Sequence, residues 1–219
     1  MRMKKMNDQR GMLTIISGFS GAGKGTVVKE ILSTYEENYS LSISATTRKP
    51  REGEVDGVHY FFLDKEVFER KISENQFLEY AQYVENYYGT PKDFVFNKLD
   101  QGISVILEIE MQGALKVKEQ YPETVLIFIT PPTAEELESR LRGRGTETEE
   151  VIASRLSRAS EEVAYMNKYD YIVLNESGKV AECAAQIHHI IETEKKKVIY
   201  SGQKISNLTE GLAKYKKGE

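Results

Sequence analysis

The sequence predicts an α/β protein in which helices cover both faces of a central parallel β-sheet. Apolar runs of strand length recur along the chain, and two of them, 103–109 and 124–129, are nearly continuous. Such runs are typical of central parallel strands buried on both faces. Stretches with helical signals lie between the runs, which is the alternation expected of a layered α/β fold. A glycine-rich segment, 18–26, joins the first apolar run to the first helical stretch.

In the first half of the chain, residues 12–17 form the first expected strand. A helix follows from about Lys24 to Tyr35, because apolar residues recur there at helical spacing. Residues 41–44 alternate like a short strand. After them the pattern changes to glycine, proline and clustered aromatic residues, which indicates a mixed lobe inserted between the first helix and the next core strand.

In the second half, two capping boxes each predict the start of a helix: Thr133 with Glu136, and Thr146 with Glu149. Residues 171–174 form the last expected core strand. A helix near the C-terminus should dock on the core through one apolar face, made of Val180, Ala184, Ile187 and Ile191. We interpret the lysine-rich tail after Lys195 as the frayed end of that helix rather than a binding arm.

Composition limits the classes of protein that this chain can represent. At 219 residues with 40% hydrophobic content, it can form one domain with its own core. A net charge of −4 argues against general attraction to nucleic acid. The single cysteine, Cys183, excludes an internal disulfide and suits a reducing cytosol. No run approaches the roughly 20 apolar residues of a transmembrane helix, so we expect a cytoplasmic protein that binds no membrane.

The glycine-rich segment has the strand, loop and helix order of a loop that holds nucleotide phosphates. Its backbone N–H groups can turn toward an anion, and the helix N-terminus adds about half a positive charge. Lys24 supplies a mobile cation for the outer phosphates. The alternative, a glycine-rich turn with a chance lysine, is disfavoured by the flanking strand and helix. The candidate ATP-binding residues are Gly18, Phe19, Ser20, Gly21, Ala22, Gly23, Lys24, Gly25 and Thr26.

The residue after the lysine departs from the general phosphate-loop pattern. That pattern has Ser or Thr there, whereas this chain has Gly25 and places Thr26 one step later. The variant GKGT is typical of nucleoside monophosphate kinases. Thr26 is therefore a candidate ligand for the Mg²⁺ that accompanies ATP, either directly or through water.

Together with this loop, four further blocks resemble the guanylate kinase family in their order along the chain: 42–62, 77–90, 107–114 and 143–156. The resemblance covers about residues 12–175. It implies a three-layer fold of the P-loop NTPase class, with an inserted mixed α+β GMP-binding lobe and a helical lid. It also implies a single domain over about residues 12–200, with three parts. The core is formed by residues 1–42, 94–134 and 165–219, the GMP-binding lobe by residues 43–93, and the arginine-rich lid by residues 135–164.

The resemblance also assigns a clamp for the phosphate of GMP, made of Arg48, Arg51, Tyr60 and Tyr88. Two guanidinium groups and two phenolic hydroxyls suit a dianionic phosphate. Glu54 is implied as the carboxylate that holds these arginines in position.

Base recognition is assigned to Glu79, with Ser44 and Thr90 completing it through their hydroxyls. A carboxylate can accept hydrogen bonds from both N1–H and the 2-amino group of guanine. Adenine offers no such pair of donors, so the wrong base would leave the carboxylate unpaired. Glu108 is implied either near the guanine or near the water molecules on magnesium. Many relatives carry aspartate at this position or at 110.

On the ATP side, the resemblance implies that Arg140, Arg144 and Arg155 close over the triphosphate and offset charge on the transferring group. With Lys24 and Arg48 they are the candidate catalytic residues. Asn175 corresponds to a residue near the adenine. Arg142 and Arg158 are interpreted as solvated surface arginines.

The implied activity is transfer of the γ-phosphoryl group of ATP to GMP, with Mg²⁺, giving ADP and GDP in purine nucleotide metabolism and GMP recycling. We expect dGMP as a further acceptor. The main alternative is a non-catalytic guanylate-kinase-like module that binds protein partners. Such modules usually lack a working phosphate loop, whereas this chain keeps Lys24 and the lid arginines.

A GTP-hydrolysing switch is a second alternative, because residues 97–100 spell the guanine-recognition motif NKxD of small GTPases. In those proteins the motif follows a core strand. Here Pro91 and Gly102 flank it, which predicts a short helix instead.

Overall fold

The computed structural model describes residues 10–143, 145, 147–197 and 202–215. Its main sheet contains five strands, all paired in parallel. The predicted parallel sheet is therefore confirmed. Across the sheet the strands follow the order β2 (Tyr39–Leu41), β7 (Ser104–Glu108), β1 (Leu13–Gly18), β8 (Val125–Thr130) and β9 (Tyr171–Leu174).

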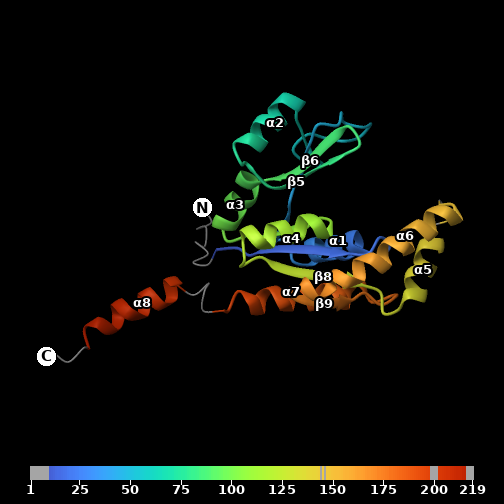
Figure 1. The fold of residues 1–219 in the computed structure, drawn as a ribbon. Coiled ribbons are helices and arrows are strands. Elements are labelled where there is room, and N and C mark those ends of the chain that lie inside the picture. Colours follow the sequence, from blue (N-terminus) through green and yellow to red (C-terminus); the bar gives the residue numbers. More distant parts are fainter. Residues whose placement is uncertain (1–9, 144, 146, 198–201, 216–219) are drawn as a thin grey trace.

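Helices cover both faces of this sheet because alternate residues of each strand point to opposite sides. Ile16 packs in one apolar cluster with α1 (Lys24–Thr34) and α7 (Val180–Glu194). Ile15 packs in the other with α3 (Lys92–Asp100) and α4 (Met111–Gln120). Figure 1 shows α4 and α7 on opposite sides of the strands. The three-layer prediction is confirmed, and the NKxD tetrapeptide lies in a helix, as expected.

A second, smaller sheet lies above the core and α4 in Figure 1. Its strands follow the order β4 (Phe61–Phe62), β3 (Ala45–Thr46), β6 (Asn86–Pro91) and β5 (Phe77–Tyr83). One pairing is parallel and two are antiparallel, so the inserted lobe is mixed, as predicted. Helix α2 (Lys65–Ser73) packs on it by stacking Phe68 on Phe77, with ring centres 4.3 Å apart.

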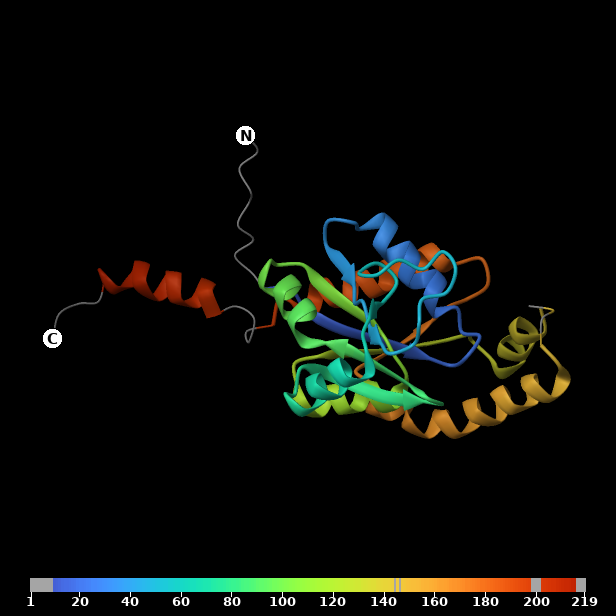
Figure 2. The same cartoon turned by 90° about the horizontal axis from the view of Figure 1, so that it is seen from above.

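The lid is helical, as predicted, and consists of α5 (Ala134–Gly143) and α6 (Glu149–Glu162). Figure 2 shows these two helices, in yellow to orange, at the opposite end of the view from α8, in red. Buried Ile152 and Ala159 attach α6 to the core cluster. A 3-10 helix, η1 (Val163–Lys168), then leads into β9. Thr133 caps α5 as expected, because its Oγ1 accepts the N–H of Glu136 at 3.2 Å.

Two local predictions are wrong. The strand expected at 41–44 is β2, which ends at Leu41. Beyond it the N–H of Ser42 still bonds to the Ile106 carbonyl, and the chain then turns toward the lobe, where the Ser44 carbonyl accepts the N–H of Phe61. The residue that precedes α6 is Thr148, so the capping box from Thr146 does not begin that helix. Thr146 itself lies outside the described residues.

The tail also differs from expectation. Helix α7 ends at Glu194, and the tail forms a second helix, α8 (Gly202–Ala213), instead of a frayed extension. The apolar side chains of this segment are exposed at Ile205, Leu208, Leu212 and Tyr215. Within the described ranges, no helix has the length and apolar character needed to span a membrane.

Candidate active site

The phosphate loop connects the end of β1 to the start of α1. Gly23, which precedes the helix, has φ of +86°, a conformation that favours glycine. A Cβ at this position would lie 2.5 Å from Nδ2 of Asn175, so the packing also excludes a side chain. Lys24 folds back over the loop and donates to the carbonyls of Gly18 at 2.7 Å and Phe19 at 3.1 Å. The loop therefore has its cation and its helix N-terminus together.

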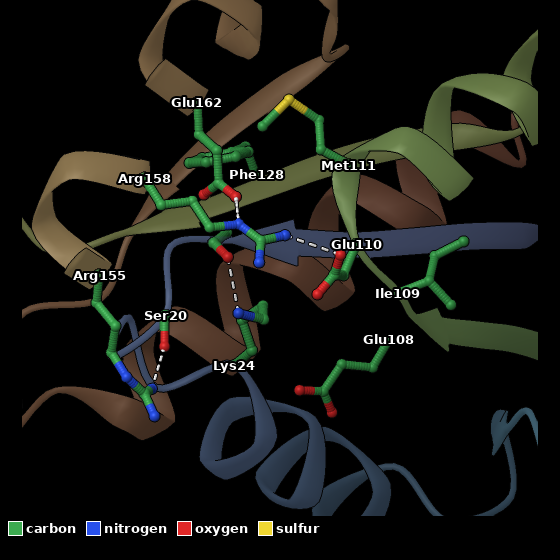
Figure 3. A pocket seen from close by; sticks show the side chains of 11 residues that line it. Ser20, Lys24, Glu108, Ile109, Glu110, Met111, Phe128, Arg155, Arg158 and Glu162 are labelled. Atoms are coloured by element: carbon green, nitrogen blue, oxygen red, sulfur yellow. Dashed lines mark hydrogen bonds and ion pairs between the residues drawn. The ribbon is translucent and has the colours of Figure 1, made fainter. Parts of the chain in front are cut away.

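A cavity of about 420 Å³ lies over this loop. It brings together residues from three elements that are distant in sequence: the phosphate loop, the end of β7 and the lid. In Figure 3 the side chain of Lys24 rises from α1 while those of Arg155 and Arg158 descend from α6. The charged and polar residues that line the cavity include Ser20, Lys24, Glu108, Glu110, Arg155 and Arg158.

Glu108 lies at the carboxyl end of β7, beside the first turn of α1. A Cβ added to Gly25 would be 3.8 Å from both of its carboxylate oxygens. Thr26, in the same turn, is exposed. Carboxylate and hydroxyl oxygens are ligands that suit Mg²⁺, which usually keeps several water molecules and shares substrate phosphates. In the described part of the chain no group of three acidic, His or Cys side chains could hold a metal without the nucleotide.

Of the residues predicted to clamp the acceptor phosphate, the structure brings together the side chains of Arg48, Tyr60 and Tyr88 in the lobe. Both terminal nitrogens of Arg48 bond to the two carboxylate oxygens of Glu54 at 2.9 Å, and Glu54 also accepts the backbone N–H of Arg51 at 2.7 Å. The guanidinium lies 5.5 Å from the ring centre of Tyr60, which packs edge-on against Tyr88 at 6.2 Å. The Arg48 bond, with that of the Arg51 N–H, lowers the pKa of Glu54 to about 2.

Glu79 lies deeper in the lobe, at an irregularity in β5. The register between β5 and β6 shifts between Phe77 and Tyr80, which is a bulge that re-aims the side chains within it. Thr90 donates its hydroxyl to Oε1 of Glu79 at 2.8 Å. Burial raises the pKa of Glu79, while the Thr90 bond opposes that rise. A Cβ at Gly113 of α4 would lie 3.3 Å from Oε2 of Glu79.

Arg140 and Asn175 lie together on the other side of the phosphate loop. Arg140 donates to the carbonyls of Asn175 at 2.5 Å and Ala22 at 3.2 Å, and pairs with Glu136. Nδ2 of the buried Asn175 also donates to the Ala22 carbonyl, at 2.8 Å. Its Oδ1 is buried with no hydrogen-bond partner among the described residues. Arg140 is therefore held beside the loop rather than among the residues that line the cavity.

The lid arginines have different environments. Arg155 donates to Oγ of Ser20 at 2.5 Å and pairs with Glu147 at 2.8 Å. Arg144 lies outside the described residues. Arg142 is exposed and pairs with carboxylates within the lid, in line with the surface role expected of it. Arg158 is exposed, in line with the solvated position expected of it, and it also lines the cavity, on the same helix face as Arg155 three residues before it.

Comparisons with known proteins agree on one family. The family model described as guanylate kinase matches residues 10–194. Proteins named guanylate kinase from Streptococcus mutans and Streptococcus pyogenes are each 55% identical over 186 residues; the match covers 85% of this chain and 88% and 87% of theirs. A crystal structure of guanylate kinase from Anaplasma phagocytophilum has a TM-score of 0.65 at 33% identity, covering 88% of this chain and 90% of that one.

Proposed function

The chain belongs to the guanylate kinase family, and we propose that it transfers the γ-phosphoryl group of ATP to GMP, giving ADP and GDP for GMP recycling in purine nucleotide metabolism. One observation carries the proposal: the phosphate loop of the core and the proposed base-recognition carboxylate of the lobe both border the segment 108–113. Glu108, at its start, lies beside the phosphate loop, and Gly113, at its end, packs against the half-buried Glu79.

The donor site suits an adenine nucleotide. Lys24 and Arg155 supply positive charge over the loop for the phosphates of ATP. The buried Oδ1 of Asn175 has no hydrogen-bond partner among the described residues. In the proposed complex it would accept a hydrogen bond from the 6-amino group of adenine. Arg140, held against the Asn175 carbonyl, supports that side of the base site.

The acceptor site suits GMP. Arg48 would offer its guanidinium group, and Tyr60 and Tyr88 their hydroxyls, to a phosphate dianion. Arg51, whose backbone N–H bonds to Glu54, would add the second guanidinium group. Glu79 would accept from N1–H and the 2-amino group of guanine, with Thr90 fixing the carboxylate and Ser44 nearby in the chain segment that enters the lobe. Because the residues assigned to the acceptor bind its phosphate and its base, we expect dGMP to be accepted too.

The reaction needs no protein nucleophile. A phosphate oxygen of GMP attacks the γ-phosphorus, and the bond from that phosphorus to the bridging oxygen of ADP breaks. Lys24 and Arg155 would offset charge on the group in transfer, and Arg48 would hold the attacking phosphate in line. Mg²⁺ bound with ATP neutralises phosphate charge, and Glu108 and Thr26 would hold the ion or its water molecules. The lid would exclude water, which would otherwise hydrolyse ATP.

We also propose that the protein works in the cytoplasm. Cys183 is a buried free thiol, and burial raises its pKa to about 11, so it is an unreactive packing residue suited to a reducing compartment.

A coupled assay of ADP release tests the proposal, with GMP, dGMP, AMP, CMP and UMP as acceptors in the presence of Mg²⁺. We expect turnover with GMP and dGMP and at most about 1% of that rate with AMP, given the discrimination that an unpaired buried group provides. GMP-independent hydrolysis of ATP would favour a nucleotide switch. Absence of turnover with every acceptor would favour the non-catalytic module.

A further inference from the structure

Helix α6 presents a second arginine to the cavity besides Arg155. Arg158 lies three residues further along, so both side chains project from one face of the helix, about 4.5 Å apart along its axis. Arg155 reaches the phosphate loop through Ser20. Figure 3 shows the Arg158 guanidinium between two carboxylates, those of Glu162 and Glu110.

Only one of these two carboxylates belongs to the lid. Glu162 is on α6 itself and accepts from Nε of Arg158 at 3.1 Å. Glu110 is 48 residues away in sequence and accepts from Nη2 at 2.9 Å. Its negative charge raises the pKa of Arg158. The pair with Glu110 is therefore a contact between the lid and the core.

Glu110 occupies a junction in the core. It follows Glu108 by two residues and immediately precedes the first turn of α4. That turn carries Gly113, which packs against Glu79. A contact on Glu110 therefore ties α6 to the segment that borders both the donor and the acceptor site.

The same pair also lies on a boundary between two cavities. A second cavity, of about 250 Å³, opens between α4 and the end of α6, on the other side of the ion pair from the phosphate loop. Four residues line both cavities: Glu110, Met111, Arg158 and Glu162. With the ion pair in place, charged side chains separate the second cavity from the phosphate site.

We propose that Arg158 is a positioning residue for phosphoryl transfer: its ion pair with Glu110 sets the position of α6, and with it Arg155, over the phosphate loop. Two contacts one helical turn apart, on Ser20 and on Glu110, fix the orientation of a rigid helix better than one. The proposal rests on the proposed function, since it concerns the rate of that transfer. A displaced α6 should also exclude water from the phosphate site less well.

The pair is well suited to testing because breaking it should leave the fold intact. The side chains of Arg158 and Glu110 are 59% and 77% exposed. Exposed ion pairs contribute little to the stability of a protein. Arg142 is a matched control: it is also a lid arginine paired with carboxylates, but its partners Glu138 and Glu149 are in the lid.

The experiment compares Arg158→Gln, Glu110→Gln, their double variant and Arg142→Gln in the full chain. We expect each single change at the pair to lower kcat about 3- to 10-fold, less than the roughly 100-fold cost of a 1 Å misplacement. KM for GMP should stay within about twofold, and the double variant should match a single one, because both remove the same contact. Arg142→Gln should retain the kcat of the unmodified chain. Arg158→Lys should recover part of the loss.

Two further measurements separate positioning from other roles. ATP hydrolysis without GMP should rise relative to GDP formation in Arg158→Gln but not in Arg142→Gln. Hydrogen exchange of the amides near residue 158, measured without nucleotide, should be faster in Arg158→Gln and Glu110→Gln. Because this last measurement needs no catalysis, it tests the ion pair even if the unmodified chain fails to phosphorylate GMP, which would overturn only the proposed function.

Several outcomes would overturn the positioning role. An increase in KM for ATP at unchanged kcat would mean that Arg158 binds phosphate directly. Effects that multiply in the double variant would mean that the two residues act independently. An equal loss in Arg142→Gln would mean that any charge change in the lid has this effect.

Discussion

Among single residues, Glu79 has the most conflicting demands placed on it. Its proposed role in binding guanine requires the ionised form, whereas burial in the lobe disfavours that form and raises its pKa. Thr90 provides one hydrogen bond to the carboxylate. In the proposed complex, this partly desolvated carboxylate would be satisfied by a guanine edge but not by adenine. Such a residue improves recognition at the expense of stability.

Replacing Glu79 with Gln should therefore separate binding from stability. An amide cannot accept twice from the guanine edge, so Kd for GMP should rise about 10- to 100-fold, as for lost hydrogen bonds to a charged group, while Kd for ATP stays within about twofold. The midpoint of thermal unfolding of the nucleotide-free protein should not fall. Titration calorimetry and thermal scans measure these quantities. Glu85→Gln, at an exposed position of the same lobe, is the control; equal weakening of both nucleotides would count against the assigned role.

The raised pKa of Glu79 also predicts opposite pH trends for stability and binding. Because the pKa of Glu79 is higher in the folded than in the unfolded protein, protonation of Glu79 stabilises the fold. This stabilisation is complete below the unfolded-state pKa and is lost as the pH rises through the folded-state pKa. GMP affinity changes the other way and falls as pH decreases through the raised pKa. The phosphate of GMP also titrates in a nearby pH range. Any pH dependence of GMP affinity that persists in Glu79→Gln therefore comes from the nucleotide. Glu54, with a pKa of about 2, stays ionised throughout this range.

Lys24 is the residue on which turnover should depend most. Lys24→Ala removes the cation that the loop carbonyls hold over the cavity, so kcat should fall at least about 100-fold, as for loss of one preorganised donor. Circular dichroism and the thermal midpoint should change little. Lys29→Ala, on an exposed position of the same helix, should keep full activity. Near-normal turnover in Lys24→Ala would remove the phosphate loop from the mechanism.

At the scale of elements, two local irregularities shape the proposed acceptor site. The bulge in β5 turns Glu79 toward α4, and the absence of a side chain at Gly113 lets the first turn of α4 approach the carboxylate. The sequence indicated a mixed lobe around Glu79 but predicted neither this strand nor helix α4 individually. It did not indicate the bulge, because a bulge depends on how two strands pair.

Gly113→Ala tests this close approach. The new methyl group would lie 3.3 Å from Oε2 of Glu79 and 3.4 Å from Cδ1 of Ile109. Alanine favours a helix over glycine by up to about 1 kcal/mol, so the thermal midpoint should hold or rise. KM for GMP should increase severalfold because the carboxylate must move. Gly211→Ala, where a Cβ meets nothing within 4 Å, should leave KM unchanged; an unchanged KM in Gly113→Ala would place guanine elsewhere.

At the scale of the whole molecule, the catalytic parts and the tail are separable. The family match ends at residue 194, and α8 begins at Gly202. Its side chains from Ile205 to Tyr215 are exposed. The tail therefore lies beyond the packed three-layer body in both sequence and structure.

Truncation after Lys197 should accordingly preserve the enzyme. We expect kcat and both KM values within about twofold and a thermal midpoint within about 2 °C, as for changes at exposed surface. Steady-state kinetics and a thermal scan of the shortened chain measure this. A large loss of activity would show that the tail reaches the active site, and a large loss of stability would show that it packs on the core.

The sequence by itself determined the features that depend on near neighbours. Glycines and a lysine between a strand and a helix encode the phosphate loop, and apolar periodicity encodes the layers. Tertiary structure alone decided which distant side chains meet: Arg140 beside Asn175, Arg158 against Glu110, and Glu79 turned by a bulge toward Gly113. Such pairs form only when separate elements pack, because the distance between them depends on the whole fold and not on their spacing along the chain.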